Sequence, residues 1–126
     1  MRVDYSDVKE MKEELMEMLE SDAEAMEAAK ECGEVWELRE VFEDALYLSE
    51  YIDGNIDIYN HDLREWAVDN WMWVEEAFLQ GVADGYAEAD HCYHRAIMAG
   101  QYVYYSAAAS EAIEEIFNDI NEEEAA

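Results

Sequence analysis

The residues best suited to bind a metal stand together at 88–94. His91, Cys92 and His94 offer nitrogen and sulfur ligands, and Glu88 with His91 has the Glu-x-x-His spacing of di-iron bundles. A di-iron site needs a second such pair, which the sequence lacks. Zinc at Cys92 would lack a second thiol pair. We therefore predict a helix start with surface histidines and no cofactor. A metal-binding bundle that uses His91 and His94 is the third hypothesis.

A second candidate, for calcium, begins at Asp53. Together with Asn55 and Asp57 it places side-chain oxygens at positions one, three and five of an EF-hand loop. The sixth position, which is glycine in EF-hands, is Ile58, and the twelfth, which should be a bidentate glutamate, is Arg64. A turn between two helices explains this segment better than a calcium site.

The sequence contains no recognisable catalytic motif. It lacks a glycine-rich phosphate loop, a Gly-x-Ser-x-Gly motif and a cysteine with a convincing base. Pairs of carboxylates occur by chance in a chain with 34 acidic residues, so no glycosidase-type pair can be selected. We predict that the protein is not an enzyme.

Glutamates recur at alternating steps of three and four near the N-terminus. This spacing predicts one stripe along a helix, made of Glu10, Glu13, Glu17, Glu20, Glu24, Glu27 and Glu31. An apolar series runs two positions earlier, about 200° around an α-helix. Its members are Val8, Met11, Leu15, Met18, Ala25 and Ala29. One face of this helix is expected to pack on a core while the other exposes a file of carboxylates.

The net charge of −27, from 34 acidic and 7 basic residues, indicates the class of partner. Such a charge repels nucleic acid and anionic lipid, so neither is expected to bind, and a strongly basic protein surface is the natural partner. Successive stripe carboxylates lie about 5 Å apart along the helix axis. Phosphates lie about 3.4 Å apart along a DNA strand, so several such helices approach the charge density of a duplex. We predict nucleic-acid mimicry, with a merely solvated face as the alternative.

A second group of predicted contacts lies near the C-terminus. Neighbouring tyrosines on a helix diverge by about 100°, so one or two of Tyr102, Tyr104 and Tyr105 are expected to reach the surface. Exposed aromatic residues beside carboxylates suit an interface, although partial burial is the alternative. The predicted contacts here are Tyr104, Tyr105, Glu111, Glu114, Glu115 and Asp119.

The elements that position these residues are all predicted to be helices. Apolar periodicity and turn signals place them at 7–31, 34–52, 60–79 and 90–120, with Asp7 as the first cap and Gly100 as a possible division of the last helix. Asp22 interrupts the apolar face of the first helix without explanation. The tail 121–126 is expected to fray. The tryptophans are expected in the core: Trp36, Trp66, Trp71 and Trp73.

Composition supports a folded, all-α protein. A hydrophobic fraction of 52%, no proline and five glycines suit helices with a core. We predict one domain over residues 1–126, a small helical bundle or an orthogonal array of four to five helices. No apolar run reaches the ~20 residues of a membrane span. Cys32 and Cys92 are expected to be reduced thiols of a cytoplasmic protein.

The stretch from Tyr51 (YIDGNIDIYNHDLREW) through Trp71 resembles small acidic proteins carried by phages and mobile elements of Gram-positive bacteria. In charge, size and helicity the chain is also similar to DNA-mimic anti-restriction and anti-CRISPR proteins. This likeness implies an inhibitor in the bacterial host cytoplasm that blocks the basic channel of a CRISPR effector or a restriction nuclease. The alternative is a non-enzymatic acidic helical module, such as a chaperone or immunity partner of a basic protein. The oligomeric state stays open, a homodimer included.

Overall fold

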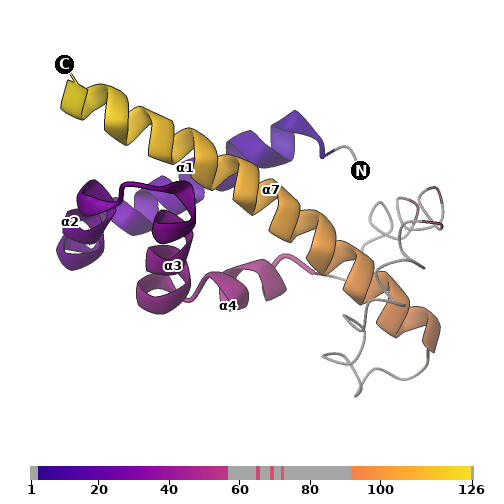
Figure 1. The fold of residues 1–126 in the computed structure, drawn as a ribbon. Coiled ribbons are helices and arrows are strands. Elements are labelled where there is room, and N and C mark those ends of the chain that lie inside the picture. Colours follow the sequence, from indigo (N-terminus) through magenta and orange to yellow (C-terminus); the bar gives the residue numbers. More distant parts are fainter. Residues whose placement is uncertain (1–2, 57–64, 66–68, 70–71, 73–91, 126) are drawn as a thin grey trace. The chain divides into compact units, whose positions relative to one another are not determined.

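The computed structural model describes residues 3–56, 65, 69, 72 and 92–125. In these residues it has five α-helices and no strand (Figure 1), which confirms the all-α prediction. The helices are α1 (Tyr5–Glu20), α2 (Ala23–Glu31), α3 (Val35–Leu46), α4 (Leu48–Asp53) and α7 (Cys92–Ala125). The helix predicted over 60–79 lies outside the described residues, except for isolated positions.

The chain divides into two compact units, which are described separately. One comprises Arg2–Tyr51 with Ala107–Ala126, and the other comprises Met1 with Ile52–Ser106. The prediction of a single domain over 1–126 therefore stays a prediction. The first unit holds α1, α2, α3 and the second half of α7, and it carries most of the predicted contact residues.

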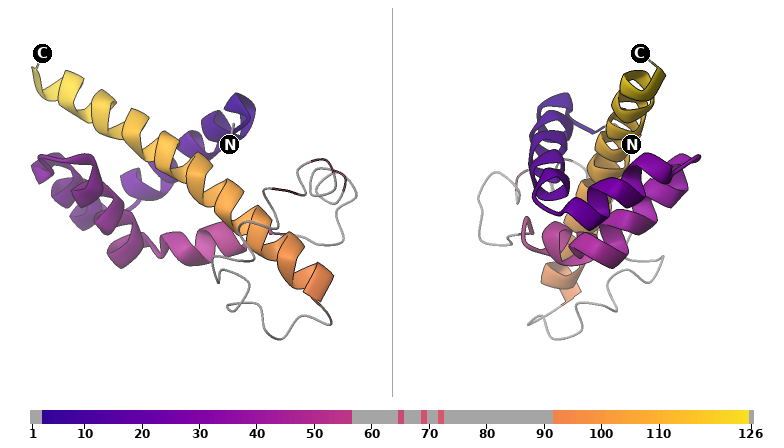
Figure 2. Two further views of the ribbon diagram at one scale, coloured as in Figure 1. Left: turned by 45° about the vertical axis from the view of Figure 1, so that its right-hand side comes forward. Right: turned by 90° about the vertical axis from the view of Figure 1, so that its left-hand side faces the viewer.

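The core of this first unit forms where the apolar stripes of its helices meet. In α1, α2 and α3 the buried residues are Val8, Met11, Leu15, Leu19, Ala25, Ala29, Leu38 and Phe42. The α7 stripe repeats every three to four residues: Ala108, Ala109, Ala112, Ile113, Ile116 and Ile120. Helices α2 and α3 pack against each other and both contact α1, as the two views in Figure 2 show.

The second half of α7 is joined to both α1 and α3 by polar contacts. Lys12 Nζ of α1 lies 2.9 Å from Asp119 Oδ2 of α7. Arg39 of α3 donates a hydrogen bond from Nη1 to Ser110 Oγ of α7. The buried side of this part of α7 carries three alanines, at 108, 109 and 112, whose small side chains allow close helix packing. Small apolar residues and two polar contacts, at Ser110 and Asp119, therefore hold this part of α7 in place.

The predicted helix over 7–31 is in fact two helices, and this prediction was wrong. α1 ends at Glu20 and α2 begins at Ala23. Asp22 caps α2, since its carboxylate accepts a hydrogen bond from the Ala25 N–H at 3.1 Å. This cap explains the acidic residue that interrupts the apolar face. The first cap was also misplaced, because Asp4 rather than Asp7 accepts from the Ser6 N–H at 2.8 Å.

The Asp22 cap can be tested by mutation. Asp22→Ala should lower the free energy of unfolding by about 1 kcal/mol, because the first turn of α2 loses an acceptor for one of its free N–H groups. Asp22→Asn should be nearly neutral, since asparagine caps equally well. Urea denaturation followed by circular dichroism measures both. A continuous helix would give the opposite sign for Asp22→Ala, because alanine is the better helix former.

Three further differences concern helix ends. The predicted helix over 34–52 ends early, because Tyr47 adopts the left-handed conformation (φ 54°) and separates α3 from α4. Its N–H donates to the Phe42 carbonyl, which closes the end of α3. α7 continues through Gly100, which is buried and does not divide the helix. It also runs to Ala125, across most of the tail that was expected to fray.

Candidate acidic interface

The α1 part of the glutamate stripe is fully available at the surface. Glu10, Glu13, Glu17 and Glu20 are all exposed, as the opposite apolar stripe requires. Glu13, Glu17 and Glu20 line a hollow of about 390 Å³ together with Glu115 of α7. The structure therefore brings one acid of the predicted C-terminal group, Glu115, beside the α1 glutamates.

Two lysines modify this α1 surface. Lys9 and Lys12 line the same hollow, so its charge is negative but mixed. The hydrogen bond to Asp119 raises the pKa of Lys12 above its ordinary 10.5, against a smaller opposing effect of burial. Stabilisation from this pair is therefore complete below pH 10.5 and lost as the pH rises through the raised value. Asp119, a predicted partner contact, already has an internal partner in Lys12.

The remaining stripe residues belong to α2. Glu24, Glu27 and Glu31 are exposed, but the turn at Ser21 and Asp22 separates them from the α1 file. On α7, Glu111 and Glu114 are exposed and Glu115 is half-buried. The acids are thus distributed over three helices rather than along one continuous line.

The tyrosines contribute less surface than predicted. Tyr104 is only 7% exposed, so it is removed from the predicted contact surface. Tyr105 is half-buried, and the two rings meet edge to face with centroids 5.4 Å apart. Partial burial, the alternative considered from the sequence, describes this pair better. Tyr102 is also half-buried.

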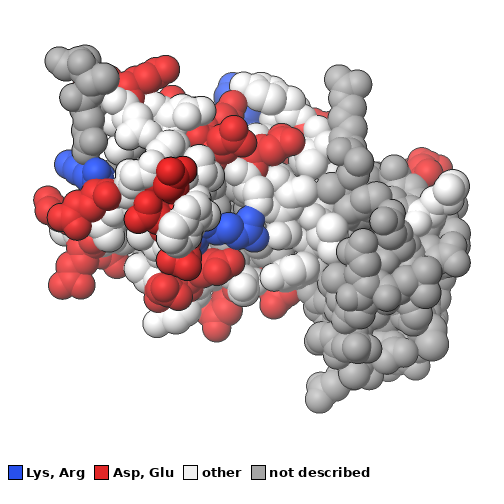
Figure 3. All heavy atoms as spheres, viewed as in Figure 1, with Lys and Arg blue, Asp and Glu red and all other residues white. Residues whose placement is uncertain are grey.

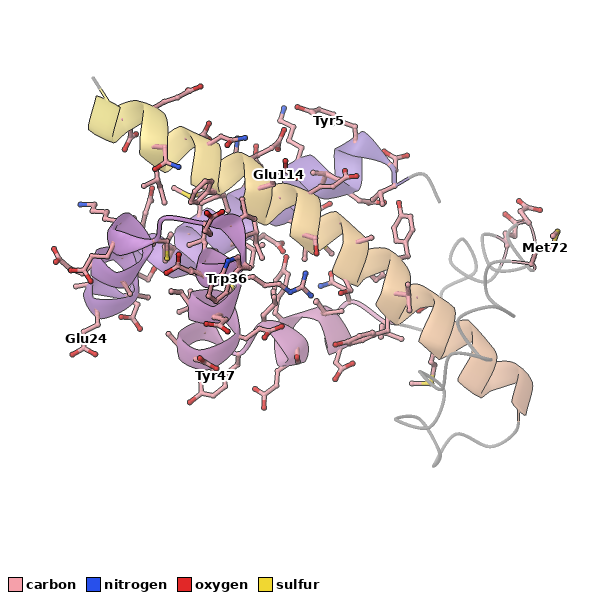
Figure 4. All side chains as sticks on the ribbon, in the orientation of Figure 1. Tyr5, Glu24, Trp36, Tyr47, Met72 and Glu114 are labelled. Carbon is pink, nitrogen blue, oxygen red and sulfur yellow. The ribbon has the colours of Figure 1, made fainter. Side chains whose placement is uncertain are left out.

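A surface that the sequence analysis missed lies between α2 and α3. Trp36, predicted as a core residue, is 61% exposed at the start of α3, so that prediction was wrong. It lies on a groove of about 700 Å³ whose rim carries six carboxylates: Asp22, Glu24, Glu31, Glu37, Glu40 and Asp44. Figure 4 shows Trp36 and Tyr47 at the two ends of α3 and Glu24 on α2. In Figure 3, which has the orientation of Figure 1, carboxylates gather over α2 and α3 on the face turned to the viewer.

The sequence did contain a signal for this groove. Trp36, Glu40 and Asp44 follow each other at steps of four, which places them on one helix face. Leu38 and Phe42, which are fully buried, occupy the other side of α3. A tryptophan in line with carboxylates indicates a surface residue, whereas composition alone favoured the core.

No metal site is present in the part of the chain that the structure describes. Within it, no group of three or more His, Cys, Asp and Glu residues is placed to hold an ion. Of the predicted candidates, Glu88 and His91 lie outside the described residues, as do Asp57 and Arg64 of the calcium loop, while Cys92 and His94 belong to α7. Among the described helices, none is long and apolar enough to cross a membrane.

Comparison of the chain with family models, with curated proteins and with solved structures finds no match. The chemistry of the exposed surface is therefore what supports a function.

Proposed function

We propose that this protein is an acidic mimic of nucleic acid, a phage-type inhibitor that occupies the basic channel of a host defence nuclease. One observation carries the proposal: all seven glutamates of the predicted stripe are exposed, in a chain with a net charge of −27. Self-repulsion of this size destabilises a compact protein, so a basic partner is the simplest reason to retain it. A CRISPR effector is the first expected target and a restriction nuclease the second.

Inhibition would follow from competition alone. Carboxylates on α1, α2 and α7 would take the positions of phosphates against lysine and arginine side chains of the channel. Three helices spread these charges over a surface, which suits a channel better than a single file. The inhibitor would block DNA or RNA entry without turnover and would bind no nucleic acid itself.

The direct test is capture followed by competition. The tagged protein is used to recover partners from bacterial lysates that express defence nucleases, and the recovered nuclease is titrated with a DNA duplex. Mutually exclusive binding of duplex and inhibitor is expected. Simultaneous binding of both to one nuclease would contradict mimicry and would favour the alternative, an acidic chaperone or immunity module.

Salt should affect the complex and the free protein in opposite directions. Raising sodium chloride should slow association with the captured nuclease by roughly 10- to 1,000-fold, the range that electrostatic steering contributes. The melting temperature of the free protein should rise, because salt screens repulsion among its carboxylates. Stopped-flow association and differential scanning calorimetry measure the two effects. An association rate that is independent of salt would remove the electrostatic basis of the proposal.

A further inference from the structure

The groove between α2 and α3 combines an exposed aromatic face with unopposed negative charge. Its volume is about 700 Å³, and Trp36 at its side is 61% exposed. Its apolar wall includes Ala25, Ala28 and Val41. No lysine, arginine or histidine occurs among the described residues that line it. It differs in this respect from the hollow beside α1, where Lys9 and Lys12 offset part of the charge.

We infer that this groove binds an arginine side chain from a basic segment of the partner protein, stacked on the indole of Trp36. The inference rests on the proposed function, which it deepens by naming a receptor site within the acidic surface. Cations are attracted to the face of an indole ring, and tryptophan is the best aromatic residue for this interaction. The six rim carboxylates supply the charge complementarity.

Arginine fits this site better than lysine. Its guanidinium is planar, so it stacks on an aromatic ring and at the same time presents paired N–H groups to a carboxylate. Glu40 and Asp44 lie one and two turns beyond Trp36 on the same face of α3. A guanidinium on Trp36 therefore has carboxylates beside it along the helix. The ammonium of lysine is more strongly hydrated and cannot make the paired contact.

Cys32 provides a local reporter of the groove. It lines the groove at the end of α2 and is half-buried, and its Sγ lies 3.3 Å from the Ala28 carbonyl. Burial raises the pKa of its thiol, and the carboxylates of Glu37 and Glu31 raise it further. A peptide bound in the groove covers this thiol, but its guanidinium also favours the reactive thiolate. Alkylation is therefore measured at a pH above the raised pKa of Cys32, where the thiol is already deprotonated and covering alone changes the rate. The alkylation rate of Cys32, followed by peptide mass spectrometry, therefore measures occupancy of this site alone.

The probe is an alanine-based peptide with one arginine per helical turn, together with versions that carry lysine or citrulline. The arginine peptide should bind the full-length protein and slow alkylation of Cys32, whereas the uncharged citrulline peptide should do neither. Trp36→Ala should weaken the arginine peptide by about 3- to 30-fold, as expected for loss of a cation–π contact. Tyr5→Ala is the matched control, because Tyr5 is 68% exposed on α1 and does not line the groove.

A charge-matched pair of variants separates the groove from net charge. Glu40→Gln with Asp44→Asn should weaken the arginine peptide by about 2- to 30-fold, the sum of two exposed ionic contacts. Glu122→Gln with Glu123→Gln removes the same charge from exposed positions at the end of α7, outside the predicted contacts and the groove, and should leave the affinity nearly unchanged. Equal losses in the two double variants would overturn the inference, as would equal affinity for the lysine peptide or unchanged alkylation of Cys32.

The inference and the proposed function can fail separately. If Trp36→Ala binds the arginine peptide as well as the parent does, while nuclease inhibition still depends on carboxylates, the groove assignment is wrong and mimicry stands. If the groove binds the arginine peptide as predicted but the protein excludes no duplex from any captured nuclease, the groove assignment stands and mimicry is wrong.

Discussion

Replacing Phe42 with alanine should lower the free energy of unfolding by about 3–5 kcal/mol. Phe42 is fully buried in α3, so the truncation removes a complete aromatic side chain from the core and leaves a cavity. Natural domains are stable by only about 5–15 kcal/mol, so much of the total is lost. Urea denaturation at constant salt measures the change, because salt itself alters the stability of so acidic a chain.

Trp36→Ala is the matched control for Phe42→Ala. Both residues are aromatic and belong to α3, but six positions on an α-helix leave them about 120° apart around the axis, so they lie on different faces. Because Trp36 is mostly exposed, its truncation should change stability by no more than about 0.5 kcal/mol. The sequence analysis placed Trp36 in the core and would therefore give a large loss for Trp36→Ala as well. A large loss for Trp36→Ala would therefore contradict its position at the surface.

The apolar half of the fold could be predicted because it depends on periodicity. Val8, Met11 and Leu15 recur at steps of three and four, and all three are buried as expected. The breaks between helices could not be predicted in the same way. The glutamate stripe stays in register across Ser21 and Asp22, and the break there is favoured by a capping hydrogen bond worth about 1 kcal/mol. Periodicity carries no information about such a local choice.

Tyr47 was unpredictable for a different reason. The left-handed conformation that ends α3 is usually adopted by glycine, sometimes by asparagine. A tyrosine in it costs about 1–2 kcal/mol, so its sequence gives no signal of a helix end. The side chain of Tyr47 is 65% exposed and lines a further hollow together with Glu14 and Met18 of α1. The residue with the unfavourable backbone conformation is therefore also an exposed aromatic residue.

The exposure of single residues of the candidate site could be predicted from the sequence, but their grouping in space could not. Exposure of the stripe glutamates follows from their position opposite the apolar face. Their grouping depends on tertiary structure, because Glu115 reaches the α1 hollow only when α7 packs across α1. The groove at Trp36 likewise exists only because α2 folds back onto α3. Sequence spacing can assign a side chain to one face of its helix, but it cannot show which other helix packs beside that face.

Two basic residues of the first unit, Lys12 and Arg39, make contacts within its fold. Lys12 pairs with Asp119, and Arg39 contacts both Glu43 and Ser110. Two of these contacts join α1 and α3 to α7, and the third lies within α3. Exposed pairs such as these contribute only about 0–1 kcal/mol each, so they orient α7 more than they stabilise it. The stripe carboxylates all face solvent, although Lys9 and Lys12 lie in the same hollow as Glu13, Glu17 and Glu20.

Changing Glu13, Glu17 and Glu20 to glutamine should weaken binding to the captured nuclease most strongly. These three residues share the α1 hollow, and glutamine keeps their shape and helix propensity. Stability should be retained or rise slightly, since like charges at i,i+3 and i,i+4 repel by a few tenths of a kcal/mol per pair. Three rim contacts at about 0.2–1 kcal/mol each would weaken the complex by roughly 3- to 150-fold. Contacts desolvated in an arginine-lined channel cost about 2 kcal/mol or more each, and the loss would then exceed roughly 10,000-fold.

The control for this variant removes the same charge from the end of α7, through glutamine at Glu122, Glu123 and Glu124. Titration calorimetry of both variants against the same nuclease compares position at equal net charge. Equal losses would mean that only net charge matters, because long-range attraction depends on the sum of charges rather than on their arrangement. A normal affinity for the α1 variant would show that this face is merely solvated. The contact would then have to lie on α7 or on the groove beside Trp36, where the Trp36→Ala variant distinguishes the two.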